Sequence, residues 1–406
     1  MSSLNYGIFG VNGFAGVHLS AARTLEEEGI LSVQAAAEPY QDRCPDTLAD
    51  LEAGGTVIYE DYRNLLDGEN GVDFVSIPTP IPLHVPMTVE SLDHGVNVLL
   101  EKPPAVLVQD IDRMQNAVDE SGLLCQVGFQ HMYDGAAREL KSRLASGAIG
   151  SVEDVVVQGY WRRPDSYYER AAWAGKVRLG DHWVLDGPLN NPLCHYIQNA
   201  LYIMCPEHAA TVRPVSVTAE LYHAHPIEGE DTVSARAQLE NGATLHTYLT
   251  LCAPDNHAPS ITFYGSDGRA EWRPGHFSIH APDLELCEDE QSGQSIMPMR
   301  NLASVLSGDG DLHSPLSATR NVILHNNGCF AAAGTIRDIP ADVVNRYETE
   351  DGDVATEVDG LMEALGTAAE KRKLLGEIEV PWASGPAREV ELDFAEFNPS
   401  DYLKEW

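Results

Sequence analysis

The chain is poor in positive charge. Its 406 residues include 26 lysines and arginines against 62 aspartates and glutamates, a formal net charge of −36, and only six residues are lysine. Such a surface repels phosphates, so we expect no nucleic acid partner. Two explanations remain, an ordinary acidic enzyme and adaptation to high salt. We favour adaptation, because concentrated counterions screen the repulsion between surface carboxylates.

Long apolar runs and paired cysteines are also absent. No stretch approaches the length of a membrane helix, and no basic segment followed by an apolar one begins the chain, so we expect neither a membrane span nor a secretory signal. The seven cysteines are scattered without a CxxC pair. This favours reduced thiols in a cytoplasmic protein over a disulfide framework or a zinc site. We expect no metal, and we expect His223 and His225 to face solvent.

The length predicts two domains. In residues 1–128, short apolar strands alternate with helices, which predicts an α/β Rossmann domain with a doubly wound parallel sheet. Ligands of such sheets bind at the carboxyl ends of the strands. Strands are expected at 6–11, 31–37, 57–59, 74–77, 96–100 and 123–129, and helices up to 28 and at 62–66, 85–94 and 111–120.

A glycine-rich turn, GVNGFAG at residues 10–16, follows the first strand and opens a helix. It departs from GxGxxG at Asn12 and Ala15, yet its place predicts that it holds the pyrophosphate of a dinucleotide. Glu38 ends the second strand, where a carboxylate accepts ribose hydroxyls and repels a 2′-phosphate. NAD is therefore the expected cofactor, with NADP as the alternative. The turn could also be purely structural and bind no ligand. The predicted contacts here are Gly10, Asn12, Gly13, Phe14, Ala15 and Glu38.

Further motifs lie at later strand ends. They are Thr79-Pro80 with His84 after it, Glu101-Lys102-Pro103, and VGFQ at residues 127–130. Together with the glycine-rich start and YEDY at residues 59–62, they resemble the glucose–fructose oxidoreductase / inositol dehydrogenase / MocA family. The resemblance extends over residues 1 to about 145, and more weakly to about 340. It implies six further cofactor-binding residues: Thr79, Pro80, His84, Glu101, Lys102 and Gln130.

Residues 129–406 are expected to form an α+β domain for substrate binding and oligomerisation. Strand-like runs at 152–161, 215–223, 232–239, 243–251 and 261–264, with an Asn241-Gly242 hairpin, predict this class. The resemblance implies an open, mostly antiparallel sheet whose exposed face makes a dimer contact, hence a homodimer or homotetramer. In the tail we expect an amphipathic helix over 354–375 and a strand over 389–394.

Three residues are the candidates for chemistry. Lys102 would polarise the reacting oxygen and stabilise a developing alkoxide. His195 would exchange the hydroxyl proton, although it could be a core histidine instead. The family commonly carries an aspartate four residues before this histidine, on the same helical face. Asn191 stands there in this chain, so a simple His–Asp pair is in doubt and Asn191 can only orient.

The segment of residues 160–175, YWRRPDSYYERAAWAG, is dense in aromatic and arginine side chains. Aromatic faces pack on sugar rings and guanidinium groups bind anions, so it suits a polyhydroxylated or carboxylated ligand. The alternative is a surface loop held by its own aromatic rings. The substrate-binding candidates are Arg162, Tyr168, Arg170, Trp173 and Asn190.

These features predict an NAD(P)-dependent oxidoreductase that acts on a secondary alcohol of a sugar, cyclitol or related polyol. Two other hypotheses stay open. One is an enzyme that uses bound NAD for a transient oxidation during glycoside cleavage or elimination. The other is a dinucleotide-binding sensor without catalysis, which the missing aspartate at position 191 favours slightly. A small-molecule substrate is expected, and no membrane partner.

Overall fold

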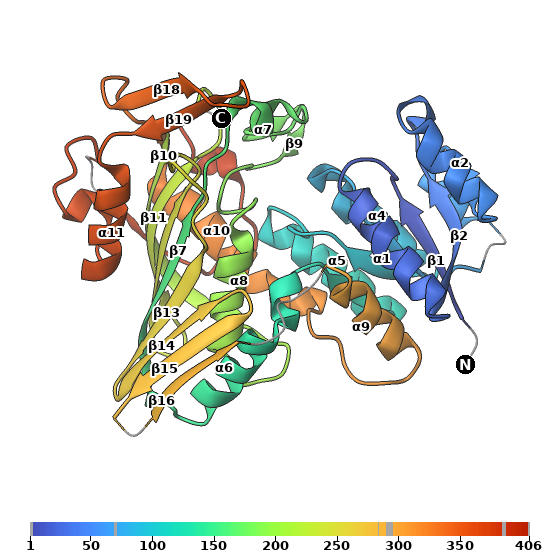
Figure 1. The fold of residues 1–406 in the computed structure, drawn as a ribbon, viewed down its shortest axis with the longest axis horizontal. Coiled ribbons are helices and arrows are strands. Elements are labelled where there is room, and N and C mark those ends of the chain that lie inside the picture. The colour runs from blue at the N-terminus through green and yellow to red at the C-terminus, as the bar shows by residue number, and fades with distance from the viewer. Residues whose placement is uncertain (1–2, 69–70, 283, 290–294, 384–386, 405–406) are drawn as a thin grey trace. The chain divides into compact units, whose positions relative to one another are not determined.

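In the computed structural model, the described residues are 3–68, 71–282, 284–289, 295–383 and 387–404, and they divide into two compact units (Figure 1). Unit 1 consists of the described residues of 1–105, 110–133 and 293–319, and unit 2 of the remainder. The sequence predicted one domain boundary, between residues 128 and 129. It did not predict that residues 293–319 return to unit 1. The cause is helix α9 (Met297–Leu306), whose Met299 and Leu302 belong to the hydrophobic core of unit 1.

Unit 1 is a six-stranded parallel sheet in the order β3-β2-β1-β4-β5-β6, which confirms the predicted doubly wound Rossmann class. Strands β4 and β5 are buried at every position, as expected of central strands covered on both faces. Its strands are β1 (Leu4–Phe9), β2 (Leu31–Ala37), β3 (Val57–Tyr59), β4 (Phe74–Ile77), β5 (Asn97–Leu100) and β6 (Cys125–Val127). The helices are α1 (Ala15–Glu27), α2 (Pro45–Ala53), α3 (Tyr62–Leu66), α4 (His84–Asp93), α5 (Val108–Ser121) and α9, with 3-10 turns η1 (Gln41–Arg43), η2 (Ile81–Leu83), η3 (Gln130–Tyr133) and η4 (Leu316–Thr319).

Unit 2 is built on a ten-stranded sheet in the order β16-β15-β14-β13-β7-β12-β11-β10-β17, with β20 paired to β10. Among the described strands of this sheet, only the pairs β7–β12 and β10–β17 are parallel, so the sheet is mostly antiparallel, as expected. The hairpin at Asn241-Gly242 joins β11 to β12, with Gly242 at φ +89°. The strands are β7 (Val152–Tyr160), β8 (Arg178–Leu179), β9 (His182–Trp183), β10 (Pro214–His223), β11 (Thr232–Leu239), β12 (Thr244–Thr250), β13 (Ser260–Gly265), β14 (Gly268–Arg273), β15 (His276–Ala281), β16 (Leu284–Asp289), β17 (Ile336–Asp338), β18 (Val344–Glu348), β19 (Val354–Val358) and β20 (Glu389–Glu391).

Helices cover both faces of this sheet. Figure 1 shows α11 on one side of it and α8 and α10 on the other. On the α11 side, Val156, Tyr222 and Tyr248 of the sheet pack against Leu361 and Leu365. The chain's own tail therefore covers part of the sheet that was expected to meet a partner subunit. The helices of unit 2 are α6 (Gly135–Ala145), α7 (Asp165–Glu169), α8 (Cys194–Ile203), α10 (Arg320–Ala333) and α11 (Leu361–Lys371), with η5 (Leu375–Glu377) and η6 (Pro399–Asp401).

The tail differs from the prediction of one helix over 354–375. Residues 354–358 form β19, which pairs with β18, and the helix begins only at Leu361. The alternation of Val354, Thr356 and Val358 suits a strand, and Gly360 at φ +73° separates it from the helix. The late strand is also shorter than expected, three residues instead of six.

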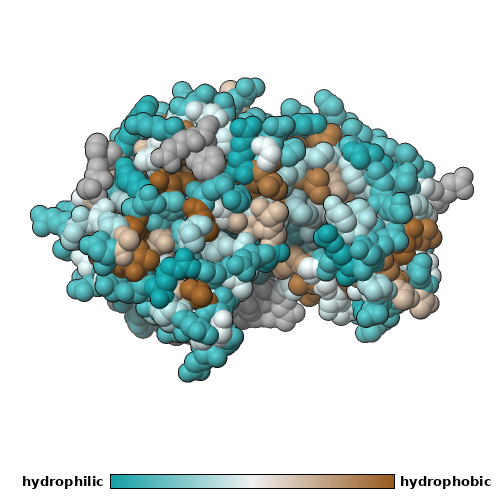
Figure 2. All heavy atoms as spheres, turned by 90° about the horizontal axis from the view of Figure 1, so that it is seen from above, coloured by the Kyte–Doolittle hydropathy of each residue, from teal (hydrophilic) through white to brown (hydrophobic). Residues whose placement is uncertain are grey.

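Hydrophilic residues dominate the face of the molecule in Figure 2, with small apolar patches between them. This agrees with the acidic composition. Among the described residues, no helix is long and apolar enough to cross a membrane.

Candidate active site

The glycine-rich turn connects β1 to α1. Gly10 and Gly13 adopt φ of +83° and +61°, a left-handed backbone that glycine tolerates best. Asn12 does not replace a glycine in conformation; its Oδ1 instead accepts a hydrogen bond from the Gly13 N–H at 2.8 Å. Phe14 is half-exposed beside the turn, and α1 begins at the buried Ala15. The start of a 13-residue helix is thus available for an anionic group.

Glu38 follows β2 and braces this turn. Its side chain is buried, its Oε2 accepts the Val11 N–H at 3.0 Å, and its Oε1 accepts the Tyr40 N–H at 2.9 Å. Each carboxylate oxygen can accept more than one hydrogen bond. The carboxylate therefore orders the turn and is still able to accept ribose hydroxyls, so the residues fit a dinucleotide.

His84 contacts the protein backbone, whereas the sequence predicted that it would contact the cofactor. Its ring is buried, with Nδ1 2.9 Å from the carbonyl oxygen of Pro103 and Nε2 2.8 Å from that of Thr79. It therefore links the segment after β4 to the segment after β5. Thr79 and Pro80 form the first of these segments, and the Thr79 hydroxyl contacts Met87 Sδ at 3.5 Å.

Glu101 turns back toward α1. Its Oε1 lies 3.0 Å from His18 Nε2, and its Oε2 accepts the Lys102 N–H at 3.1 Å. A side chain at Gly128 would collide with this carboxylate, since an added Cβ would lie 2.7 Å from Oε1. One hollow of unit 1 brings the predicted residues Phe14, Glu101 and Gln130 together with His18 and Gly128.

Lys102 is half-buried, next to a histidine that sequence reasoning missed. Burial, together with the charge of Lys102, lowers the pKa of His131 to about 4. His131 is therefore neutral at physiological pH, and Lys102 is the cation of this pair. The signal was available in the sequence, since His131 directly follows Gln130 at a strand end.

Asn191 and His195 do not share a helical face, contrary to the expectation. Helix α8 begins at Cys194, and Asn191 lies in the preceding turn. The reason is Pro192, because the residue before a proline is disfavoured in helical conformation. Asn191 Nδ2 donates instead to Asp186 Oδ1 at 3.2 Å. His195 is buried in the first turn of α8, all of whose residues are buried.

Asp186 is the hub of this part of unit 2. Its buried Oδ2 accepts the Gly175 N–H at 2.7 Å and lies 3.8 Å from the Arg170 guanidinium. A carboxylate thus stands beside Asn191, five positions upstream of it. Sequence reasoning did not assign Asp186, because nothing in its spacing distinguishes it from the many other acidic residues.

Asn190 is fully buried, so the geometry does not favour its expected contact with substrate. Its amide donates to the Leu185 carbonyl at 3.0 Å and accepts from Asn326 Nδ2 at 3.1 Å. Asn327 bonds the backbone of Val106 and Val108. The pair Asn326-Asn327, which carried no recognisable signal in the sequence, therefore anchors two loops.

We call residues 160–175 the aromatic–arginine segment. Within it, Arg163 stacks over Trp161 and Tyr167 at 4.6 and 5.2 Å, and Arg170 stacks over Tyr167 and Trp173 at 3.7 and 4.8 Å. Cation–π contacts therefore hold the segment together. Arg170 is exposed and Trp173 is half-buried, so both can meet a ligand.

The other two candidates of the segment are tied inward. Arg162 Nη1 donates to the Pro254 carbonyl at 3.1 Å. The Tyr168 ring packs 4.9 Å from the ring of His225. Both contacts favour a supporting role for these side chains.

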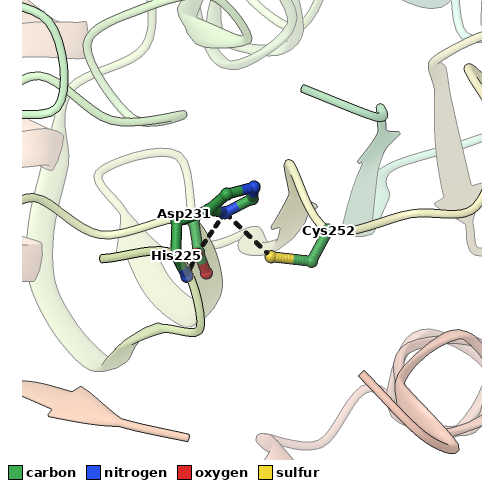
Figure 3. Close-up of side chains that lie close together, drawn as sticks. All are labelled: His225, Asp231 and Cys252. Atoms are coloured by element: carbon green, nitrogen blue, oxygen red, sulfur yellow. Dashed lines mark hydrogen bonds and ion pairs between the residues drawn. The ribbon is translucent and has the colours of Figure 1, made fainter. Parts of the chain in front are cut away.

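Two side chains of unit 2, Glu230 and His225, are buried, which the sequence did not predict. Burial, with the charges of Asp186 and Asp231, raises the pKa of Glu230 to about 8, so its carboxyl is protonated at neutral pH. Its Oε1 accepts the Leu189 N–H at 3.3 Å, and a side chain at Gly187 would overlap it. His225 is buried as well, so its expected exposure is wrong. It lies against Asp231 and Cys252, and this is the group among the described residues whose donor atoms lie close enough together for a metal ion (Figure 3).

Comparison with known proteins identifies the family. Residues 4–129 match the oxidoreductase family with an NAD-binding Rossmann fold, and residues 137–271 match the GFO/IDH/MocA C-terminal domain. Among curated relatives, scyllo-inositol 2-dehydrogenase (NAD(+)) of Bacillus subtilis is 31% identical over 103 residues, 25% of this chain and 29% of the relative. The D-xylose 1-dehydrogenase [NADP(+)] of Haloarcula marismortui is 25% identical over 265 residues, 61% of this chain and 67% of the relative. A 2,7-anhydro-N-acetylneuraminate hydratase of Mediterraneibacter gnavus is 28% identical over 152 residues, 37% of this chain and 38% of the relative.

Solved structures share the fold. The WlbA dehydrogenase of Bordetella pertussis, in complex with NADH and UDP-GlcNAcA, superposes with a TM-score of 0.68 at 22% identity over 82% of this chain and 96% of that chain. A levoglucosan dehydrogenase in complex with NADH superposes with a TM-score of 0.68 at 16% identity over 82% of this chain and 97% of that chain. The first of the curated relatives is matched over less than a third of its length. With both of its domains matched, the chain belongs to the glucose–fructose oxidoreductase / inositol dehydrogenase / MocA family of NAD-binding oxidoreductases.

Proposed function

We propose that the protein is an NAD(P)-dependent dehydrogenase of a secondary alcohol in a sugar, cyclitol or related polyol. The observation that carries this proposal is that the glycine-rich turn, Glu38 and the Glu101-Lys102 pair all follow strands of one parallel sheet. Ligands of such sheets bind at those strand ends. The names of the inositol, xylose and levoglucosan dehydrogenases support this substrate class.

Residues 10–15 and Glu38 would hold the dinucleotide, with Thr79, Pro80, Glu101, Lys102 and Gln130 toward its nicotinamide end. The nicotinamide supplies the hydride acceptor or donor when it is bound. Glu38 favours NAD over NADP, because a buried carboxylate repels a 2′-phosphate. His84 is better assigned to positioning, since both of its ring nitrogens face backbone carbonyls.

Lys102 acts on the reacting oxygen. Its ammonium polarises a carbonyl or stabilises the alkoxide that forms as the hydroxyl proton leaves. Glu101 is engaged by His18 and by the Lys102 backbone, which fixes the segment that carries the lysine. His131, held neutral, adds no second positive charge beside it.

His195 takes or returns the hydroxyl proton. Asn191 orients the turn before its helix through the hydrogen bond to Asp186. Arg170 and Trp173 contact the substrate, while Arg162, Tyr168 and Asn190 hold the surrounding segments in place.

The protein would work in the cytoplasm of a salt-adapted cell. None of the seven cysteines, all of them among the described residues, forms a disulfide, in keeping with a reducing compartment. The net charge of −36 supports adaptation to high salt. We also propose a homodimer or homotetramer. The tail packs against β7, β10, β12 and Tyr264 of β13, so strands β14–β16 remain for such a contact.

The second candidate is an NAD-dependent hydratase, lyase or glycoside-cleaving enzyme with transient oxidation. The relative named as a hydratase supports it. Such an enzyme would convert its substrate without net formation of NADH. A non-catalytic sensor would bind NAD and convert nothing.

The test is a panel of sugars, cyclitols and sugar acids with NAD and NADP in concentrated KCl, followed by nicotinamide absorbance and by product analysis. Lys102→Ala should lower kcat by about 100- to 1000-fold. His195→Ala should lower it about 100-fold, with an effect that shrinks at high pH and little change in NAD affinity. Lys371→Ala, on α11 far along the chain, is the control. Wild-type turnover in His195→Ala would show that His195 is a core histidine without a role in the reaction.

A further inference from the structure

The tail of the chain returns to the aromatic–arginine segment as a β-hairpin. Strands β18 and β19 form a two-stranded sheet of their own, and they lie beside α7 (Figure 1). Val344 and Val358 anchor the hairpin in the hydrophobic core under the large sheet of unit 2. An isolated hairpin is marginally stable, so these apolar contacts turn it into a fixed support. The matched family domains end at residue 271, so this support lies beyond them.

Helix α7 depends on this hairpin for its N-terminal cap. The helix has five residues, and its N-cap residue is Pro164, whose side chain has no hydrogen-bond acceptor. The first N–H groups of a helix need acceptors from outside the helix. Asp353 supplies one: its Oδ1 accepts the Ser166 N–H at 3.3 Å, and its Oδ2 accepts the Ser166 hydroxyl. A carboxylate 187 residues later in the chain thus does what an N-cap side chain normally does.

The other strand of the hairpin holds the first residue of α7. Arg346, in β18, donates from Nη2 to Asp165 Oδ2, and both side chains are partly buried. Asp353 is itself fixed within the hairpin. Its N–H donates to Thr349 Oγ1 at 3.2 Å, and its Oδ1 accepts the Val354 N–H at 2.8 Å. Each side of the hairpin therefore holds one of the first two residues of α7.

The position of α7 sets the position of the side chains that can meet a ligand. Arg170 directly follows the helix. Its guanidinium stacks over the Tyr167 ring and donates to the Tyr167 carbonyl. The same guanidinium lies 4.8 Å from the centre of the Trp173 ring. A shift of α7 would therefore move Arg170 and break its stacking with Trp173.

We propose that the β18–β19 hairpin is a clamp that positions the aromatic–arginine segment, with Asp353 and Arg346 as its positioning residues. The clamp holds Arg170 and Trp173 in place and thereby sets the affinity for substrate. This effect on substrate rests on the proposed function, whereas the clamping of α7 does not. The residues proposed to hold the dinucleotide belong to unit 1, so the clamp acts on substrate binding and not on cofactor binding.

The alternative is a hairpin that only covers the sheet of unit 2 and stabilises the fold. In that case, removing the Asp353 carboxylate would lower the Tm but would leave both the exchange of the α7 amides and the KM unchanged. Concentrated salt screens the Arg346–Asp165 ion pair, because the Debye length is only about 3 Å at 1 M. The hydrogen bonds of Asp353 act at contact and are screened less, so Asp353 is the better position to test.

Hydrogen exchange of the full-length protein in concentrated KCl tests the clamp. In Asp353→Ala, the amides of residues 166–170 should exchange about 5-fold faster or more, as expected when a helix cap is lost. Asp353→Asn keeps an oxygen acceptor and should stay within about 2-fold of the wild type. Asp351→Ala, which removes an exposed aspartate of the same turn, is the matched control and should change nothing. Unchanged exchange in a folded Asp353→Ala variant refutes the clamp.

A double-mutant cycle tests the second contact. Arg346→Ala and Asp165→Ala should each speed the exchange of the α7 amides by about 2- to 5-fold, the range of a partly exposed ion pair. The double variant should exchange no faster than the faster single variant, because both substitutions remove the same contact. If Asp353→Ala does not fold, this cycle decides the proposal, and purely additive effects overturn it.

The kinetic readout separates this inference from the proposed function. Asp353→Ala should raise the KM for the polyol about 5-fold or more, while kcat and NAD affinity stay within about 2-fold, and Asp353→Asn should restore the KM. A lowered Tm with an unchanged KM would show that the hairpin only stabilises the fold. If the wild type converts no polyol, the proposed function fails, and the exchange rates still decide whether the hairpin holds α7.

Discussion

Replacing Glu230 by glutamine should stabilise unit 2, and the gain should depend on pH. The folded chain holds the Glu230 proton up to about pH 8, whereas an unfolded chain releases it near the ordinary pKa of 4.5. Between these values the unfolded state binds fewer protons than the folded state, so the free energy of unfolding falls as pH rises. Glutamine keeps the acceptor for the Leu189 N–H and carries no proton to lose.

The magnitude follows from the shift of about 3.5 pH units. Each unit corresponds to about 1.4 kcal/mol, so the wild type should lose about 5 kcal/mol of unfolding free energy between about pH 4.5 and pH 8 that Glu230→Gln retains. At pH 7 the difference should be about 3 kcal/mol. Above about pH 8 it should be constant, because both states of the wild type are then ionised.

Urea unfolding at fixed KCl concentration, followed by tryptophan fluorescence, measures this. All six tryptophans come after residue 160, and those the structure describes belong to unit 2, so the signal reports on the unit that contains Glu230. Glu370→Gln, on the exposed side of α11, is the matched control and should show no such dependence. A difference between wild type and Glu230→Gln that is the same from about pH 5 to pH 9 would refute the reasoning.

Three further predictions concern the acid groups and the cofactor. Asn191→Asp should lower the unfolding free energy by about 1–3 kcal/mol at neutral pH, because the new carboxylate would face Asp186 Oδ1. Adding Asp186→Asn should recover most of this loss in urea unfolding. If the effects of the two substitutions on the unfolding free energy simply add, the contact is contradicted. Molar KCl should raise the Tm of the protein, since the net charge is −36, and equal melting in dilute buffer would argue against salt adaptation. Glu38→Gln should weaken NAD binding and narrow the preference for NAD over NADP in fluorescence titrations; tighter NADP binding by the wild type would mean that Glu38 is not the ribose contact.

Most of the fold could be predicted because local patterns and tertiary packing agree. The strands of unit 1 are short apolar runs bounded by turn residues, and β2 and β4 lie where the sequence predicts them. Helix α9 could not be assigned to unit 1 in the same way. Its amphipathic pattern shows that it packs on something, but only the folded chain shows that its partner is the core around α1.

The candidate site was less predictable than the fold. Motif residues such as Glu38 and Lys102 can be recognised in the sequence because they follow the ends of predicted strands. Asp186, Glu230 and His225 do not, because their roles come from burial and from partners far away in the sequence. Burial also reversed the expectation for His225, whose flanking residues suggest an exposed strand. In a chain with 62 acidic residues, only the structure separates a buried carboxyl group from a surface one.

The scarce lysines illustrate the same point from the side of positive charge. Lys141 is buried in α6, and its ammonium donates to the carbonyl of Tyr202 at 2.8 Å and to that of Cys205. These carbonyls lie at the C-terminal end of α8, where a cation is favoured by the helix dipole. Burial lowers the pKa of Lys141 to about 8. Desolvation therefore disfavours the same positive charge that the carbonyl groups stabilise. The Lys141 ammonium therefore caps the C-terminal end of the helix that carries His195.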